Sequence, residues 1–124
     1  MASTGNVTLT AALTGAPSGS RTFNTTQTFT AAVDATMVVA LLSGNNTILV
    51  PTGATCVIIT GPNAVSPQPN PSWSGTLALK GSAGDPTGVN ISTSQATKIA
   101  WDTAPASFVV WASTTGATIE IFFA

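Results

Sequence analysis

The sequence predicts an all-β protein, a β-sandwich of about ten short antiparallel strands. Three observations support this class: apolar residues recur at every second position, Thr, Val, Ile, Phe and Trp dominate these segments, and turn-forming residues separate them. No segment repeats its apolar residues at helical spacing. The pattern does not encode strand order, so we expect a jelly roll and keep an immunoglobulin-like sandwich as the alternative.

The predicted strands follow one another at short intervals along the chain. In order, they span residues 6–13, 22–30, 36–42, 47–50, 55–60, 76–80, 89–92, 98–101, 107–112 and 118–123. Clusters of Gly, Pro, Asn and Ser, such as those at 43–46 and 81–88, separate them and are typical of turns. A chain of 124 residues suits one domain. We therefore expect residues 1–124 to form a single sandwich with a proline-rich loop at 61–75.

The first predicted strand shows the alternation most clearly. Val7, Leu9 and Leu13 alternate with Thr8 and Thr10, which predicts one buried face and one wet face. The strand at 76–80 has the same pattern.

Four strands break this rule, at 36–42, 55–60, 107–112 and 118–123, because both of their faces are apolar. A two-layer sandwich covers only the inner face of each sheet. The outer face then needs either a loop folded back over it or another protein chain. With so little charge to keep an apolar face soluble, we favour an interface with a partner.

The segment 62–73 has four prolines in twelve residues. Proline cannot donate to a central ladder and prefers extended geometry. The segment is therefore either a stiff arm that contacts a partner or a rigid loop that shields a sheet edge. The residues predicted to form a protein interface are Met37, Val39, Leu41, Pro67, Pro69, Pro71, Trp73, Val109, Trp111 and Phe122.

Charge is scarce, with three Lys or Arg against four Asp or Glu and a net charge of -1. Without a basic cluster the chain lacks the phosphate contacts that drive nucleic-acid binding. The longest apolar run, at 37–42, is six residues, against the roughly 20 of a membrane-spanning helix. The first residues lack the charged and apolar regions of a secretory signal, so we expect synthesis in the cytoplasm without export. We expect neither a nucleic-acid nor a membrane partner.

The sequence also argues against an enzyme. It contains no His, the commonest general base near neutral pH, and no serine stands in a recognisable nucleophile motif. The loop at 84–90 has one carboxylate, whereas calcium sites take several, so it is predicted to be an ordinary turn. Cys56 is the only cysteine and lies in an apolar strand, where it behaves as a small hydrophobe. No catalytic residue, cofactor or metal site is predicted.

Tryptophan provides the alternative to a purely structural role. An exposed indole offers a flat apolar face on which a sugar ring can stack. Trp73 and Trp101 are the candidate platforms, whereas Trp111 lies in the middle of a strand and is expected to be packed. The alternative function is therefore a carbohydrate- or receptor-binding β-sandwich module.

The segment Leu79-Lys80-Gly81-Ser82-Ala83-Gly84-Asp85, followed by Thr87-Gly88-Val89, resembles a turn-and-strand sequence of small all-β structural proteins of tailed bacteriophages. The resemblance covers about a tenth of the chain. It implies a virion component, such as a capsid decoration (cement) protein or a head or tail accessory. It also implies a homo-oligomer, often a trimer, that binds the major capsid protein through apolar and main-chain contacts. The family contributes no catalytic residues. With this resemblance, the carbohydrate- or receptor-binding alternative would be a module of a phage tail or fibre.

Overall fold

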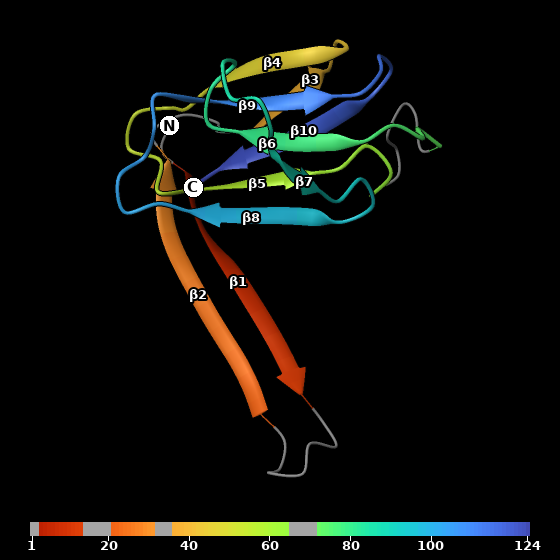
Figure 1. Cartoon of the computed structure of the whole chain (residues 1–124). Helices are drawn as coiled ribbons and strands as arrows, with labels where there is room; N and C mark the ends of the chain where they lie inside the picture. Colours follow the sequence, from red (N-terminus) through yellow and green to blue (C-terminus); the bar gives the residue numbers. More distant parts are fainter. Residues whose placement is uncertain (1–2, 14–20, 32–35, 65–71) are drawn as a thin grey trace. The chain divides into compact units, whose positions relative to one another are not determined.

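The computed structural model describes residues 3–13, 21–31, 36–64 and 72–124, the first two segments by their backbone (Figure 1). The regular structure in these ranges consists of ten β-strands. Within the same ranges, no helix has the length and apolar character needed to cross a membrane. The contacts divide the chain into two units, residues 1–34 with Ala124 and residues 35–123.

The first unit contains a long β-hairpin. Its strands β1 (Ser3–Leu13) and β2 (Arg21–Ala31) pair antiparallel over eleven positions, from Ser3 opposite Ala31 to Leu13 opposite Arg21. They form a two-stranded sheet of their own. Both segments were predicted as strands, but as members of the sandwich.

The register divides the hairpin residues between two faces of different chemistry. Directly opposed residues of an antiparallel pair share a face, and successive residues alternate between faces. The pairs on one face are Ser3 with Ala31, Gly5 with Phe29, Val7 with Gln27, Leu9 with Thr25, Ala11 with Phe23 and Leu13 with Arg21. The pairs on the other face are Thr4 with Thr30, Asn6 with Thr28, Thr8 with Thr26, Thr10 with Asn24 and Ala12 with Thr22. One face is therefore largely apolar and the other is almost entirely Thr and Asn.

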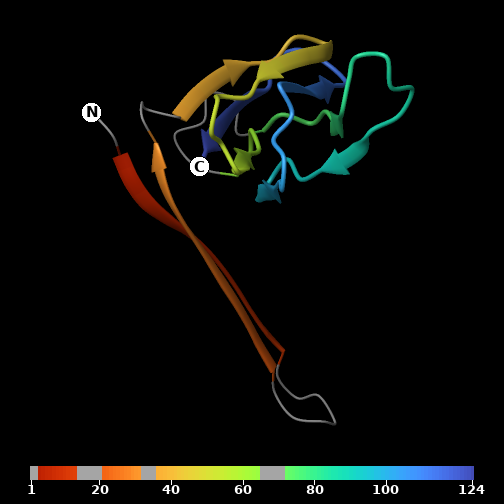
Figure 2. The ribbon, with the colours of Figure 1, turned by 90° about the vertical axis from the view of Figure 1, so that its left-hand side faces the viewer.

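The second unit is a sandwich of two four-stranded antiparallel sheets. Its strands are β3 (Thr36–Ala40), β4 (Gly44–Leu49), β5 (Cys56–Thr60), β6 (Leu77–Lys80), β7 (Val89–Ile91), β8 (Ala96–Ala100), β9 (Ser107–Ala112) and β10 (Thr118–Phe123). One sheet has the order β3-β10-β5-β8 and the other the order β4-β9-β6-β7. Figure 2 shows the two layers, with the edge strands β3 and β4 at the same end of the sandwich.

The strand pairing is nested. β3 pairs with β10, β4 with β9, β5 with β8 and β6 with β7. The chain therefore runs as one long antiparallel ribbon rolled into two sheets, which is the jelly-roll arrangement of eight strands. The predicted β-sandwich is confirmed, but it has eight strands rather than ten, because the first two form the separate hairpin.

The core of the sandwich lies between the inner faces of the two sheets. Val57, Val110, Ile119 and Ile121 come from central strands and are fully buried. The other buried members of this core are Leu41, Ile48, Ile59, Trp73, Leu77, Phe108, Ala112, Ala117 and Phe123. Each central strand thus contributes alternate residues to the core, as its period of two predicts.

Trp73 is anchored in this core by its polar groups as well as its ring. Its indole N–H donates to the carbonyl oxygen of Thr115 at 3.0 Å. Its backbone N–H donates to Asn63 Oδ1 at 3.1 Å, and the Asn63 amide donates back to the Trp73 carbonyl at 2.7 Å. Gly75 lies directly against the indole, where a Cβ atom would collide with the ring. The end of the proline-rich segment is therefore tied to the core.

Candidate functional site

Two surface regions of the sandwich are candidates for binding a ligand or a partner. One is the outer face of the sheet β4-β9-β6-β7, around Trp111. The other is the pair of edge strands β3 and β4, where large apolar side chains are exposed.

The outer face of β9 is partly covered by the loop that follows β6. Asn45 on β4 donates a hydrogen bond from its amide nitrogen Nδ2 to the carbonyl oxygen of Ala83 in that loop, at 3.2 Å. Because β9 lies between β4 and β6, this bond brings the loop across β9. Val109, on the outer face of β9, is accordingly only 2% exposed. Val109 is therefore covered by this chain itself and needs no partner chain for its burial.

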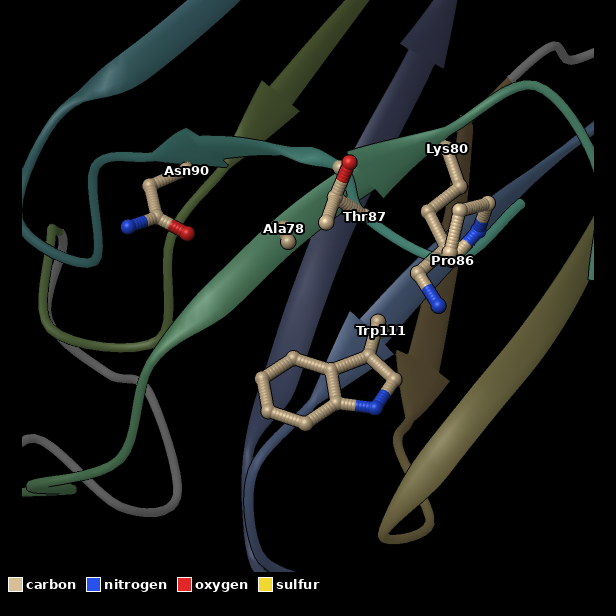
Figure 3. A pocket seen from close by; sticks show the side chains of 7 residues that line it. Ala78, Lys80, Pro86, Thr87, Asn90 and Trp111 are labelled. Atoms are coloured by element: carbon tan, nitrogen blue, oxygen red, sulfur yellow. The ribbon is translucent and has the colours of Figure 1, made fainter.

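The same loop forms the wall of an open depression of about 340 Å³ (Figure 3). The residues that line it are Ala78, Lys80, Pro86, Thr87, Gly88, Asn90 and Trp111. They come from β6, β7, β9 and the loop between β6 and β7, and Trp111 is half-buried. The depression therefore combines an aromatic floor with polar side chains at its margin.

Asp85 shapes the loop from within. The backbone N–H of Ser82 donates to Asp85 Oδ2 at 2.9 Å, and the Ser82 hydroxyl lies 3.2 Å from Asp85 Oδ1. The Asp85 N–H donates to the Ser82 carbonyl at 3.2 Å. Because these hydrogen bonds, chiefly that from the Ser82 backbone, and the nearby Lys80 charge favour the ionised carboxylate, the pKa of Asp85 lies below its ordinary value of 3.8. The only carboxylate of this loop therefore stabilises the turn at Ser82–Asp85.

Lys80 supplies the one charge among the residues that line the depression. Its Nζ lies 3.3 Å from Asn45 Oδ1, so Asn45 holds both the ammonium group and the loop. An ammonium group has three N–H donors, which leaves Lys80 able to donate to a ligand as well.

The second region, which we call the β3–β4 edge, consists of Met37, Val38, Leu42 and Leu49. These side chains are 40%, 64%, 69% and 73% exposed. β3 and β4 are the outermost strands of their sheets at the same end of the sandwich, and neither contains Pro or a charged residue. Proline and charged residues on an edge strand normally prevent the strand from pairing with another chain.

The connection between β3 and β4 is held in place by Asn46. Its Oδ1 accepts from the Leu42 N–H at 2.9 Å, and its Nδ2 lies 2.8 Å from the Leu42 carbonyl oxygen and 3.1 Å from that of Val110. Gly44, the first residue of β4, has a φ of 94°, which a residue with a side chain rarely adopts. Leu42 is therefore presented to solvent by an ordered turn.

The predicted interface residues of β3 mostly belong to the core. Leu41 is buried and Val39 is half-buried against the core, while Met37 is exposed at the edge. The most exposed residues of this segment are Val38 and Leu42, at the even-numbered positions that alternate with Met37, Val39 and Leu41. Sequence reasoning missed them because both parities of this segment are apolar.

The other predicted site residues are distributed over the sandwich. Trp73 is 6% exposed in the core, and Trp101 is half-buried, with its ring centroid 6.4 Å from that of Phe108. Trp111 and Phe122 are half-buried. Pro67, Pro69 and Pro71 lie outside the described residues. The structure therefore presents Trp111, rather than Trp73 or Trp101, at an open depression.

Sequence reasoning also missed Lys80, Thr87 and Asn90 as neighbours of Trp111. The only available signal was the turn-forming cluster at 81–88, which predicted a loop but not the face over which it folds.

The described side chains show no further chemical centre. Among them, no three His, Cys, Asp or Glu residues lie close enough together to hold a metal ion. In the same part of the chain, every buried side-chain nitrogen or oxygen has a hydrogen-bond partner. Comparisons with protein-family models, with curated proteins and with solved structures find no match.

Proposed function

We propose that this chain is a non-enzymatic structural protein that works by association. Its most specific form would be a decoration (cement) protein that stabilises a phage head through apolar contacts with the major capsid protein. The observation that supports association is the β3–β4 edge, where four large apolar side chains are exposed on two uncharged edge strands and the connection between them.

The energetics favour covering this edge. Burying one Val or Leu side chain contributes about 1.5–3 kcal/mol. Val38, Leu42 and Leu49 keep most of their surface in water, so this free energy is still available for binding a partner. Among the described strands, β3 pairs only with β10, so its outer edge offers main-chain hydrogen bonds to an extended partner strand.

The hairpin supports the same proposal. A two-stranded sheet is at best marginally stable alone in water, and it needs packing on its apolar face or further strands. The register gives β1 and β2 such a face, with the positions of Val7, Leu9 and Phe23 on it. We propose that this face is packed in the assembled particle.

Two further points support the virion assignment. The segment that resembles phage structural proteins forms the loop after β6, and jelly rolls occur in viral capsid domains as well as in lectins. Fold alone does not determine function, so these points are analogies. In this proposal the protein is a homo-oligomer, with a trimer as the expected state, and it resides in the virion.

The carbohydrate-binding alternative on Trp73 and Trp101 has weaker support. Trp73 is a core residue whose indole N–H is bonded to Thr115, and Trp101 packs on Phe108. Neither residue lines the depression of the outer face.

Light scattering of the purified chain over a wide range of concentration tests the proposal, together with cosedimentation with phage heads stripped of decoration protein. We expect a mass above that of the monomer or binding to the heads. Both should weaken in the triple variant Val38→Thr, Leu42→Thr, Leu49→Thr.

Val89→Thr is the matched control, because Val89 is 71% exposed but lies on β7, at the opposite edge of its sheet. It should associate like the unaltered chain. A monomer at every concentration that also fails to bind heads would contradict the proposal.

A further inference from the structure

The floor of the depression is an indole whose face is left open by its neighbours. Trp111 on β9 lies opposite Asn45 on β4 and opposite Ala78 on β6. The side chain of Ala78 is a single methyl group, so it leaves space beside the Trp111 ring above the sheet. Figure 3 shows the indole face toward the viewer, with Lys80, Pro86, Thr87 and Asn90 above the ring in this view.

The wall of the depression is built before any ligand binds. The loop is closed on itself by Ser82 and Asp85 and joined to β4 by the bond between Asn45 and Ala83. Where it returns to β7, Gly88 packs so closely on β6 that a Cβ atom would lie 2.6 Å from the carbonyl oxygen of Leu79. A preformed wall spares a ligand the entropic cost of ordering it.

The polar groups of the depression match a polyhydroxylated ligand with one negative charge. Asn90 offers an amide that both donates and accepts, and Thr87 offers a hydroxyl. Lys80 offers an ammonium group, and no carboxylate is among the lining residues. The Asp85 carboxylate of the same loop accepts hydrogen bonds from Ser82.

We propose that this depression binds an acidic saccharide, with one sugar ring stacked on Trp111 and its carboxylate bound by Lys80. The volume of about 340 Å³ lies at the small end of ligand pockets, about 300–1,000 Å³. A nucleotide would also stack on an indole, but one ammonium group is a poor match for a doubly charged phosphate. The site goes beyond the proposed assembly role and can be tested separately from it, because none of the β3–β4 edge residues lines the depression.

The indole N–H signals of a ¹H–¹⁵N spectrum test the proposal directly. Trp111→Phe identifies the Trp111 signal by its loss. Galacturonic acid and N-acetylneuraminic acid should shift this signal, while the signal of Trp73, bonded to Thr115 in the core, should stay in place. Galactose, the neutral counterpart of galacturonic acid, should bind about tenfold more weakly, the loss expected when one charged hydrogen bond is removed.

Two lysine variants separate the site from nonspecific attraction. Lys80→Gln should abolish the preference for galacturonic acid over galactose, whereas Lys98→Gln, on β8 in the other sheet, should retain it. Adenosine monophosphate is the competing probe. The proposal is overturned if no acidic sugar shifts the Trp111 signal, if Lys80→Gln keeps the preference, or if adenosine monophosphate binds more tightly than the acidic sugars.

Discussion

Asn45 on the edge strand β4 donates a hydrogen bond to the carbonyl oxygen of Ala83, 38 residues further along the chain, at 3.2 Å. The loop that contains Ala83 begins at the end of β6, and β9 lies between β6 and β4. The Asn45 side chain therefore holds over the outer face of the sheet the loop that provides part of the wall of the Trp111 depression.

Removing this amide should loosen the loop. Asn45→Ala eliminates the bonds to Ala83 and Lys80, and we expect a loss of about 1 kcal/mol in the free energy of unfolding. Amide hydrogens of residues 82–88 should exchange faster. Urea unfolding and hydrogen exchange measure the two effects.

Asn90→Ala is the matched control, since Asn90 is an exposed amide of the same sheet, and it should change stability by less than about 0.5 kcal/mol. Equal effects of the two substitutions would show that the loop does not depend on Asn45.

Gly75 leaves room for the indole of Trp73. Gly75→Ala would force the ring out of its place in the core, and overpacking of this kind costs about 1–3 kcal/mol. Tryptophan emission should also shift to longer wavelength as Trp73 gains water. Gly84→Ala is the control, because a Cβ atom there would approach its nearest neighbour only to 3.9 Å. A Gly75→Ala protein as stable as Gly84→Ala would be inconsistent with the close contact.

A single charge placed on β3 should prevent association through the β3–β4 edge. Val38 lies directly opposite Glu120 on β10, so Val38→Lys creates a cross-strand pair of opposite charges worth roughly 0.2–1 kcal/mol. The fold should therefore tolerate the change, while a lysine on an edge strand opposes pairing with another chain. Light scattering should report a lower mass than for the unaltered chain, with an unchanged circular dichroism spectrum. Unchanged association would assign the interface to another surface.

The loop after β6 should respond to acid through Asp85. The folded state lowers the pKa of Asp85, so its contribution is present above the ordinary pKa of 3.8 and disappears as pH falls through the lower, folded value. An NMR titration of the Asp85 carboxyl carbon should therefore have its midpoint below 3.8.

Ser82→Ala tests the cause of this shift. It removes the hydroxyl bond but keeps the bond from the Ser82 N–H, so the midpoint should rise part of the way toward the ordinary pKa. A midpoint that does not move would exclude the Ser82 hydroxyl as a cause.

The strands of this protein could be predicted from the sequence, because period-2 patterning is local. The segments at 107–112 and 118–123 agree with β9 and β10 at both ends. Membership in a sheet is not local. The alternation in β1 reads the same whether the strand pairs in a sandwich or in a hairpin, which is why ten strands were expected where the sandwich has eight.

The candidate sites could be predicted only in part, for a similar reason. In β3 both parities are apolar, so the sequence could not distinguish the inward Val39 from the exposed Val38. Trp111 was expected to be packed because it lies in mid-strand, but its exposure depends on the small Ala78 beside it and on a loop distant in sequence. The exposure of Val38 and that of Trp111 both depend on contacts between distant segments, which the alternation of apolar residues does not specify.

The nested pairing of the sandwich has a consequence for how the chain can be made. The last strand, β10, occupies an interior position between β3 and β5, and its residues Ile119 and Ile121 are fully buried. During synthesis, β3 cannot pair with β10 until residue 123 has emerged from the ribosome, some eighty residues after β3 itself. Pairing between segments so distant in sequence is slow. Loss of β10 would therefore remove an interior strand and separate β3 from β5 and β8, whereas loss of an edge strand would leave the rest of its sheet paired.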